Sequence, residues 1–354
     1  MGEIVFKNIC KSFGNVKVIE DLNLTIRDGE FTVLVGASGC GKTTALRMIA
    51  GIGPATSGEL FIDGHDIVDV PPGKRDIAMV FQNYAIYPTM TVRGNIEFGL
   101  INKKVPKAER DRLIAEVSEV VGLTPYLKRK PSELSGGQRQ RVALARAMVK
   151  KPSVFLMDEP LSNLDAKLRA TMRTELIELH RKLRATFVYV THDQAEAMSM
   201  ADTIILMDAG KIMQQGSPET IYNDPDNVFT AQFIGIPPMN IFQIDGKYVG
   251  YRPEKVSLAR ETCSDVYCRT GRILTREMLG SETLYKVTIE DASAPENGVS
   301  VMVKSAESRL QVDELVYLKV EDRHLYFFDQ NEQRVREGQD AGYGQYLSMV
   351  KGGR

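Results

Sequence analysis

The stretch that decides the fold is Gly36-Ala37-Ser38-Gly39-Cys40-Gly41-Lys42-Thr43, followed by Thr44. It fits the pattern G-x-x-x-x-G-K-[ST] and lies between an apolar run, Phe31–Val35, and a helical pattern, Lys42–Ala50. Glycines let the backbone bend so that its N–H groups point at a phosphate beside the helix N-terminus. Lys42 adds a charge for the β- and γ-phosphates, and the Thr43 hydroxyl can ligate Mg²⁺. The stretch from Gly36 to Thr44 is therefore predicted to bind a nucleotide.

A second element ends in two carboxylates. Val154-Phe155-Leu156-Met157-Asp158-Glu159 is an apolar run with the length of a buried strand. Such a strand would hold Asp158 where it supports Mg²⁺, and Glu159 would lie beside the γ-phosphate as the base that orients the attacking water. Alone, an apolar run ending in Asp-Glu also fits an ordinary strand end. Together with the phosphate loop, it predicts nucleotide hydrolysis.

The first two-thirds of the chain alternate strand and helix patterns, which indicates an α/β fold around a largely parallel sheet. Strand-like runs without helices over residues 4–35 predict an added antiparallel sheet. A long helical excursion predicts a helical subdomain over about residues 83–150. The expected strands are Ile4–Phe6, Val18–Ile26, Phe31–Val35, Ile77–Phe81, Val154–Met157, Phe187–Val190 and Thr203–Met207, and the expected helices are Lys42–Ala50, Lys107–Val121, Gln138–Lys150, Ala166–Leu183 and Asp193–Ser199.

A proline- and glycine-rich junction, Gly235-Ile236-Pro237-Pro238, predicts a boundary between a domain at 1–235 and a second at 236–354. Beyond it, short strand-like runs with turn residues between them predict a small β-barrel. The segment from about Gln330 onward is polar and is expected to be a tail.

Composition excludes several classes of protein. The 354 residues carry 45 basic and 46 acidic side chains, a net charge of −1, which argues against a dedicated nucleic-acid binder, although a local patch stays open. No stretch of about 20 mostly apolar residues suits a membrane helix. Charged residues near Met1 argue against a secretory signal. Four cysteines are too few for a disulfide scaffold, so we expect thiols at Cys263 and Cys268 as elsewhere.

One pentapeptide identifies a family. Leu134-Ser135-Gly136-Gly137-Gln138 precedes a helix and resembles the signature motif of ATP-binding cassette ATPases. A serine and two glycines at a helix start can form a second phosphate-binding cap. The resemblance implies that two subunits pack head to tail, so that Ser135, Gly136, Gly137 and Gln138 of each close over the ATP of the other. Ser162-Asn163-Leu164-Asp165 resembles the loop that crosses the dimer, which implies that Asp165 acts in trans.

Three further residues match positions of that family. Gln82, in Val80-Phe81-Gln82-Asn83, resembles the glutamine that senses Mg²⁺ and water, and His192, in Val190-Thr191-His192-Asp193, resembles the histidine that contacts the γ-phosphate. Phe13, in Lys11-Ser12-Phe13-Gly14, matches the aromatic residue that stacks on adenine, although an aromatic near a strand end also fits a core. The resemblance implies catalysis by Glu159, His192 and Gln82, and Mg²⁺ ligation by Thr43, Gln82 and Asp158.

Other stretches are similar to the maltose-transporter type of importer ATPase, namely His192–Met198, Phe233–Asn240 and Gly250-Tyr251-Arg252-Pro253-Glu254. This resemblance implies a P-loop ATPase cassette followed by an OB-like regulatory barrel, working as a homodimer with ATP and Mg²⁺. It also implies two transmembrane permease subunits docked near Gln82 and the helical subdomain, an extracytoplasmic solute-binding protein acting indirectly, and a peripheral place on the cytoplasmic face of the plasma (inner) membrane. A sugar, polyol or glycerol-phosphate is the expected solute, with no nucleic-acid partner. An importer for another solute such as a polyamine, or an ABC ATPase not tied to transport, stays open.

Overall fold

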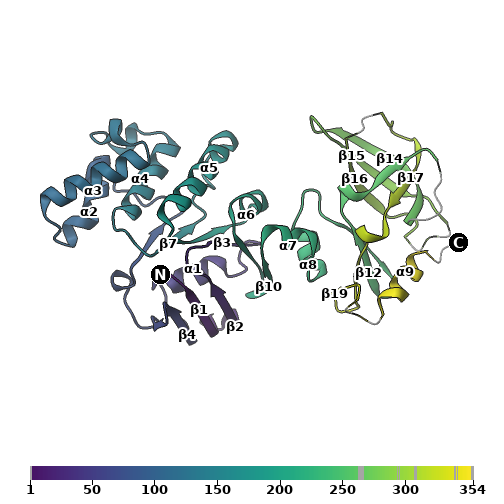
Figure 1. Cartoon of the computed structure of the whole chain (residues 1–354), viewed down its shortest axis with the longest axis horizontal. Helices are drawn as coiled ribbons and strands as arrows, with labels where there is room; N and C mark the ends of the chain where they lie inside the picture. The colour runs from purple at the N-terminus through teal and green to yellow at the C-terminus, as the bar shows by residue number, and fades with distance from the viewer. Residues whose placement is uncertain are drawn as a thin grey trace. The chain divides into compact units, whose positions relative to one another are not determined.

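The computed structural model describes residues 2–261, 267–292, 294, 296–306, 309–338, 340 and 342–351. The chain forms two compact units, Met1–Pro218 and Glu219–Arg354, shown in Figure 1. The junction at Gly235–Pro238 predicts a boundary after residue 235, whereas the helices between residues 218 and 235 cluster with the second unit.

The centre of the first unit is a six-stranded sheet with the strand order β10-β9-β3-β8-β7-β6. Its strands run parallel except β10, which pairs antiparallel with β9 at the edge. Every residue of β3, β7 and β8 is buried, as expected of continuous apolar runs in a parallel sheet covered on both faces. The strands are β3 (Phe31–Gly36), β6 (Ile77–Val80), β7 (Val154–Asp158), β8 (Thr186–Thr191), β9 (Thr203–Asp208) and β10 (Lys211–Gly216).

A second sheet in this unit is antiparallel, with the order β2-β1-β4-β5, which confirms the added sheet. Apolar side chains of β1 and β2, among them Ile4, Phe6 and Leu24, pack into one core with the first helix. The strands are β1 (Ile4–Phe13), β2 (Val16–Ile26), β4 (Ser57–Ile62) and β5 (His65–Asp66).

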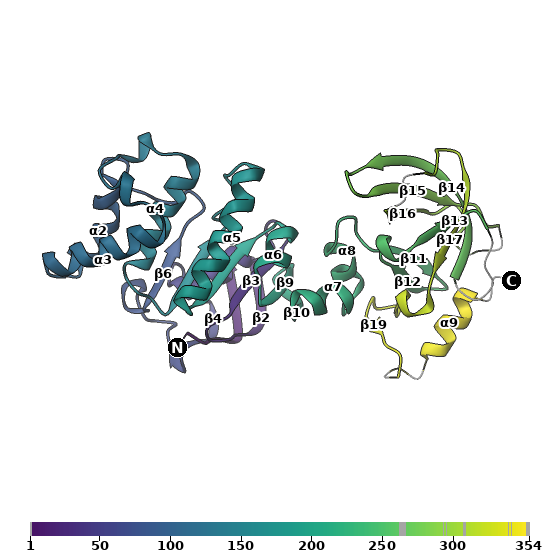
Figure 2. The same cartoon turned by 45° about the horizontal axis from the view of Figure 1, so that its top comes forward.

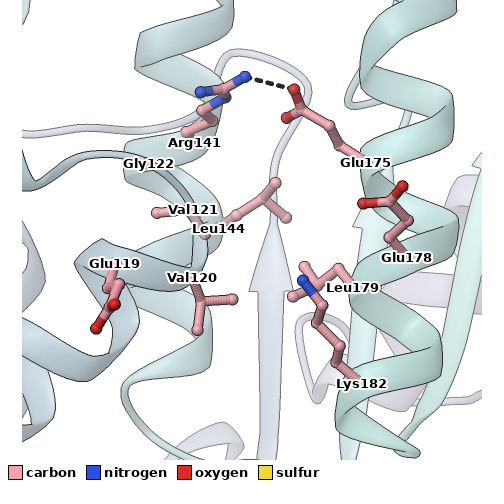
Figure 3. Close-up of a pocket in the computed structure, with 10 residues that line it drawn as sticks. All are labelled: Glu119, Val120, Val121, Gly122, Arg141, Leu144, Glu175, Glu178, Leu179 and Lys182. Atoms are coloured by element: carbon pink, nitrogen blue, oxygen red, sulfur yellow. Dashed lines mark hydrogen bonds and ion pairs between the residues drawn. The ribbon is translucent and has the colours of Figure 1, made fainter.

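Helices α2, α3 and α4 pack together (Figure 2), and α4 also contacts strand β6 of the central sheet. A cavity of about 280 Å³ separates α3 and α4 from α5, and an ion pair between Arg141 and Glu175 spans it (Figure 3). The helices of the unit are α1 (Lys42–Ala50), α2 (Val92–Asn102), α3 (Lys107–Val120), α4 (Gly136–Met148), α5 (Ala166–Leu183) and α6 (Gln194–Met200).

The second unit has two antiparallel sheets, ordered β11-β12-β18-β19 and β13-β17-β14-β15-β16, around a shared apolar core. This arrangement is consistent with the expected OB-like fold. The strands are β11 (Asn240–Ile244), β12 (Lys247–Tyr251), β13 (Ser257–Ala259), β14 (Tyr267–Met278), β15 (Thr283–Ile289), β16 (Ser300–Ser305), β17 (Leu315–Val320), β18 (Tyr326–Phe328) and β19 (Arg334–Val335), and the helices are α7 (Pro218–Asn223), α8 (Val228–Phe233) and α9 (Tyr343–Lys351).

Arg252 explains why α7 and α8 belong to the second unit. Its side chain is 1% exposed, and its guanidinium donates to the carbonyl oxygens of Tyr222 at 2.8 Å, Ala231 at 3.1 Å and Ile234. These carbonyls lie toward the ends of α7 and α8, where helices leave acceptors unpaired. One buried cation of the barrel therefore holds both helices.

Two expectations for the second unit need correction. The segment expected to be a polar tail contains β19 and α9, because Tyr346 and Val350, one helical turn apart, pack into the apolar core. Cys268 is disulfide-bonded, so the prediction of a thiol is wrong there. Cys263 lies outside the described residues.

Among the described residues, none of the helices combines the length and apolar character that a membrane crossing requires.

Candidate functional site

The glycine-rich loop joins β3 to α1. Gly39 and Gly41 have φ angles of 83° and 104°, a region that favours glycine because it lacks a Cβ. Gly41 is the N-cap of α1, and no side chain among the described residues caps that helix. The first N–H groups of α1 are therefore available to an anion. Ala37 and Ser38 are exposed at the mouth of the loop.

Lys42 turns back into this loop. Its ammonium is buried and donates to the carbonyl oxygens of Gly36 and Ala37, both at 2.8 Å. The Sγ atom of buried Cys40 lies 3.6 Å away. A buried cation needs such partners, and the carbonyls hold it beside the loop's N–H groups, where a phosphate would lie.

The register of the central sheet brings the other predicted residues to the same edge. Val35 pairs with Thr191, Asp158 with Val190, and Val80 with Met157. Because these strands are parallel, the segments that follow their carboxyl ends meet at one edge of the sheet, where ligands of α/β folds bind. Those segments hold the phosphate loop, Glu159, His192 and Gln82.

Thr43 and Asp158 form a pair of oxygen donors. The Thr43 hydroxyl donates to Asp158 Oδ1 at 2.8 Å, and Asp158 is 6% exposed at the end of β7. Arg47 lies 3.9 Å from the other carboxylate oxygen. A hydroxyl and a carboxylate are hard ligands that suit Mg²⁺, which usually completes its shell with water and substrate phosphates. The two residues therefore fit the ion that the sequence predicts.

The three predicted catalytic side chains converge on one carboxylate oxygen. Gln82 Nε2 lies 3.4 Å and His192 Nδ1 3.3 Å from Glu159 Oε2. The backbone N–H of Glu159 donates to the Val190 carbonyl at 3.0 Å, and its φ of 45° is strained for a residue with a Cβ. The fold thus holds Glu159 at the sheet edge, where the half-exposed His192 can reach both the carboxylate and a ligand.

Two residues that follow Glu159 closely in the chain, Ser162 and Asn163, hold Gln82, and the sequence motifs assign neither of them a role of its own. Gln82 Nε2 also donates to Ser162 Oγ at 3.2 Å, and Asn163 Nδ2 donates to the Gln82 carbonyl at 2.9 Å. Ser162 in turn donates to the Glu159 carbonyl at 2.8 Å. The available signal was that both precede Asp165 in the loop predicted to cross the dimer.

The signature residues belong to a different cluster. Ser135 caps α4 by accepting from the Gln138 N–H at 3.3 Å, and the Gln138 side chain accepts from the Ser135 N–H at 2.9 Å. Asp165 caps α5 by accepting from a backbone N–H at 2.9 Å. A Cβ at Gly136 or Gly137 would lie 3.2 and 3.0 Å from leucine side chains at the start of α5. These contacts are with α4 and α5, not with the phosphate loop.

Phe13 lies at the end of β1 with 58% of its surface exposed. The Lys11 ammonium is 4.7 Å from the centre of its ring. An exposed ring does not match the alternative of a core position, and a flat ring beside a cation suits a stacking surface.

A hollow of about 410 Å³ opens beside the Gln82 loop. Its lining includes Met79, Phe81, Tyr87 and Phe98, and the last two rings are 4.7 Å apart. The Arg146 guanidinium lies 5.6 Å from the centre of the Tyr87 ring, and burial lowers the pKa of Arg146. The hollow thus offers an apolar floor with a cation at its side.

Comparisons with known proteins match two separate stretches of the chain to two families. Residues 19–162 match the ABC transporter family, and residues 249–328 match the TOBE domain family. A solved structure of cbiO1 from Clostridium perfringens, part of the ABC transporter complex cbiONQ, has a TM-score of 0.58 and 25% identity, and it covers 62% of this chain and 89% of its own.

Several curated proteins are similar over most of the chain. The sn-glycerol-3-phosphate import ATP-binding protein UgpC of Brucella abortus is 44% identical over 356 residues, 95% of this chain and 100% of the relative. The trehalose/maltose import ATP-binding protein MalK of Thermococcus litoralis is 46% identical over 351 residues, 96% of this chain and 94% of its own. The UgpC of Bartonella bacilliformis is 57% identical over 241 residues, 68% and 70% of the two chains.

Proposed function

Since this chain belongs to the ABC transporter family as the ATP-binding subunit of an importer, we propose that its two glycine-containing helix starts form the two halves of an ATP site shared between two copies of the chain. One half is the Gly36–Thr44 loop with Lys42. The other is Ser135–Gln138 with Asp165, contributed by the second copy. The observation that carries the proposal is the convergence of Gln82 and His192 on Glu159 Oε2, at the sheet edge that also holds the loop.

The loop binds the triphosphate through the N–H groups of α1 and the Lys42 ammonium, while Phe13 offers its exposed ring to the adenine. Thr43, Asp158 and Gln82 would hold Mg²⁺. That ion supplies charge neutralisation on the β- and γ-phosphate oxygens.

Hydrolysis needs a water aimed at the γ-phosphorus. The Glu159 carboxylate accepts a proton from that water while the oxygen bonds to phosphorus, and the bond from phosphorus to the bridging oxygen of ADP breaks. Gln82 and His192 restrain the same carboxylate, and His192 is exposed enough to donate to the γ-phosphate. Loss of the γ-phosphate removes the group that both copies hold, so the two copies separate.

A partner docks on the hollow beside Gln82. Its apolar floor at Met79, Phe81 and Phe98 suits the apolar face of a short helix. Transmembrane permease subunits of an importer are the expected partners, with an extracytoplasmic solute-binding protein acting through them. The chain then works as a peripheral protein at the cytoplasmic face of the membrane, and residues 236–354 act as the regulatory domain.

The solute class follows from the relatives. Their names give sn-glycerol-3-phosphate and trehalose/maltose, so a sugar, polyol or glycerol-phosphate is the proposed cargo. Transport assays with the neighbouring permease and binding-protein genes would test it, and uptake of an unrelated solute such as a polyamine would refute it.

Glu159→Gln tests the chemistry. The amide keeps the shape of the side chain but takes no proton, so we expect ATP binding to persist while turnover falls about 100-fold or more. Glu178→Gln is the matched control, since Glu178 is an exposed carboxylate on α5. Parental turnover in Glu159→Gln would refute the assignment of Glu159 as the base.

Mixing two inactive variants tests the shared site. Lys42→Ala lacks the loop cation, and Ser135→Arg blocks the signature turn. In a head-to-tail dimer of one copy of each, one site is doubly damaged and the other combines intact halves. Turnover should therefore rise when the two are mixed. If each chain completes its own site, the mixture gives only the average of the two.

A further inference from the structure

Glu196 is a buried carboxylate without a role in the site described above. It lies in the first turn of α6 and is 3% exposed. Its Oε2 atom accepts from the Tyr189 hydroxyl at 2.8 Å and from the Thr191 hydroxyl at 2.7 Å. Burial raises the pKa of Glu196, and the two hydroxyls oppose that rise. Burying a carboxylate costs free energy, which two hydroxyl donors offset only in part. Such a hydrogen-bonded carboxylate is expected to fix the geometry of the residues that donate to it.

The residue that these bonds enclose is His192. Thr191, which donates to Glu196, accepts from the Asp193 N–H at 3.0 Å. Asp193 then caps α6 by accepting from the N–H groups of Ala195 at 2.7 Å and Glu196 at 3.2 Å. The backbone is therefore held on both sides of His192, while the side chain of His192 is 57% exposed and lies 3.3 Å from Glu159.

Arg169 joins this network to the loop that precedes α5. Its guanidinium donates to the Leu164 carbonyl at 3.0 Å and lies 3.5 Å from Asp193 Oδ2 and 4.0 Å from Glu196 Oε1. A small cavity of about 30 Å³ is lined by Glu159, Ser162, Arg169, Thr191, His192, Asp193 and Glu196. The buried network thus borders the catalytic carboxylate directly.

We propose that Glu196 is a positioning residue that fixes His192 through Thr191 and, with Arg169, ties the His192 turn to the Ser162–Asp165 loop. The inference rests on the proposed function, because it takes His192 as the contact to the γ-phosphate. The inference adds that Glu196, which itself contacts no ligand, determines the geometry of the contact between His192 and the γ-phosphate. Without Glu196, the Thr191 hydroxyl loses its acceptor and the turn at His192 loses its fixed geometry.

The test uses the full-length protein and measures kcat, KM for ATP and the melting temperature of each variant. We expect Glu196→Ala to lower kcat roughly 10- to 100-fold, as small displacements of catalytic groups do. KM for ATP should change by less than about twofold, because the N–H groups of α1 and the Lys42 ammonium supply most of the binding of the triphosphate. Glu196→Gln keeps one acceptor oxygen for Thr191 and should recover part of the rate; it also serves if Glu196→Ala does not fold.

Glu296→Gln is the matched control. Glu296 is 1% exposed in the second unit and accepts from a tyrosine hydroxyl and an arginine, both at 2.6 Å. It resembles Glu196 in burial and partners but has no place in the ATP site. We expect it to lower the melting temperature and to leave kcat of the folded protein unchanged.

A double-variant cycle separates positioning from general stability. If Glu196 acts through His192, adding Glu196→Gln to His192→Ala lowers kcat no further than His192→Ala alone. Suppose that His192→Ala lowers kcat and that adding Glu196→Gln lowers kcat further, by the same factor as in the parent protein. That result overturns this inference and leaves the proposed function intact. Parental turnover in His192→Ala refutes the role of His192 in the proposed function, and the inference with it.

Discussion

Two helices of the first unit begin at glycine-rich turns, and they satisfy their N-termini in different ways. The N-cap of α1 is Gly41, which has no side chain to offer, whereas Ser135 and Gln138 cap α4 reciprocally. The start of α1 is therefore open to a phosphate, with the Lys42 ammonium beside it. The start of α4 is already satisfied within its own chain. The open start of α1 can bind a phosphate alone, and the satisfied start of α4 supports the proposal that α4 contributes to a ligand already held by another copy.

Removing the cation at α1 should have the largest effect. Lys42→Ala leaves the loop N–H groups without the charge that neutralises the β- and γ-phosphates, so we expect turnover to fall roughly 100- to 1,000-fold. Binding of a fluorescent ATP analogue should weaken as well. Lys182→Ala, at an exposed position near the end of α5, is the control for loss of a lysine charge. Equal ATP affinity in Lys42→Ala and the parent protein would contradict the assigned role of the open helix start.

Adding a methyl group at the start of α1 and at the start of α4 should change the free energy of unfolding by different amounts. Gly41 has a φ of 104°, and its Cβ would lie 3.2 Å from Ile19 Cγ1, so Gly41→Ala should lower the free energy of unfolding by about 1–3 kcal/mol. Gly136 is helical, and its Cβ would meet only the end of the Leu164 side chain at 3.2 Å. Alanine also gains helix propensity there, so the free energy should change by less than about 1 kcal/mol.

Urea unfolding of Gly41→Ala and Gly136→Ala measures this difference. Equal losses would mean that the left-handed backbone at Gly41 carries no conformational demand, and that the two turns differ only in their side chains.

The sequence predicts the phosphate loop at the start of α1 and the side chains around it, because each of these signals lies within a short continuous stretch of residues. Each of the loop, Asp158–Glu159 and His192 follows a continuous apolar strand, and parallel strands place their carboxyl ends together. The hydrogen bonds that position these residues could not be predicted from the sequence, since Gln82 and its partners Ser162 and Asn163 are about 80 positions apart.

Long-range contacts also account for the places where the structure differs from the sequence-based predictions. Helices α7 and α8 group with the second unit because Arg252 holds them, and its carbonyl partners lie 18 to 30 residues earlier in the chain. The segment from about Gln330 onward was expected to be a tail because its overall composition is polar, but Tyr346 and Val350 of α9 enter the core and Tyr343 and Leu347 pack against it. Helix α2 is not among the helices predicted from the sequence, because its two glycines, Gly94 and Gly99, weaken its helical pattern.

Removing the cap of α4 should have a smaller effect on stability and a selective effect on turnover. Ser135→Ala deletes the acceptor for the Gln138 N–H, which typically costs about 1 kcal/mol. ATP affinity of the isolated chain should stay unchanged, because the open site is at α1, while turnover falls. Thr91→Ala is the matched control, since Thr91 caps α2 by accepting from the Gly94 N–H at 3.1 Å.

The comparison of these two cap variants is decisive. Both should lose similar stability in thermal unfolding, but only Ser135→Ala should lose turnover. If Thr91→Ala slows hydrolysis as much, the effect at Ser135 comes from a weakened helical layer and not from its proposed contact with a nucleotide.

The smallest expected effect concerns how α4 is held against α5. The Arg141–Glu175 pair in Figure 3 is partly exposed, with 29% and 34% of the two side chains accessible, so breaking it with Glu175→Gln should cost about 0.2–1 kcal/mol. Added salt should shrink the difference from the parent, because it screens exposed charges. Glu178→Gln, on the same helix beside the same cavity, is the control. A much larger loss would mean that this ion pair sets the position of α4 against α5, and that the signature turn depends on a charge farther along its own helix.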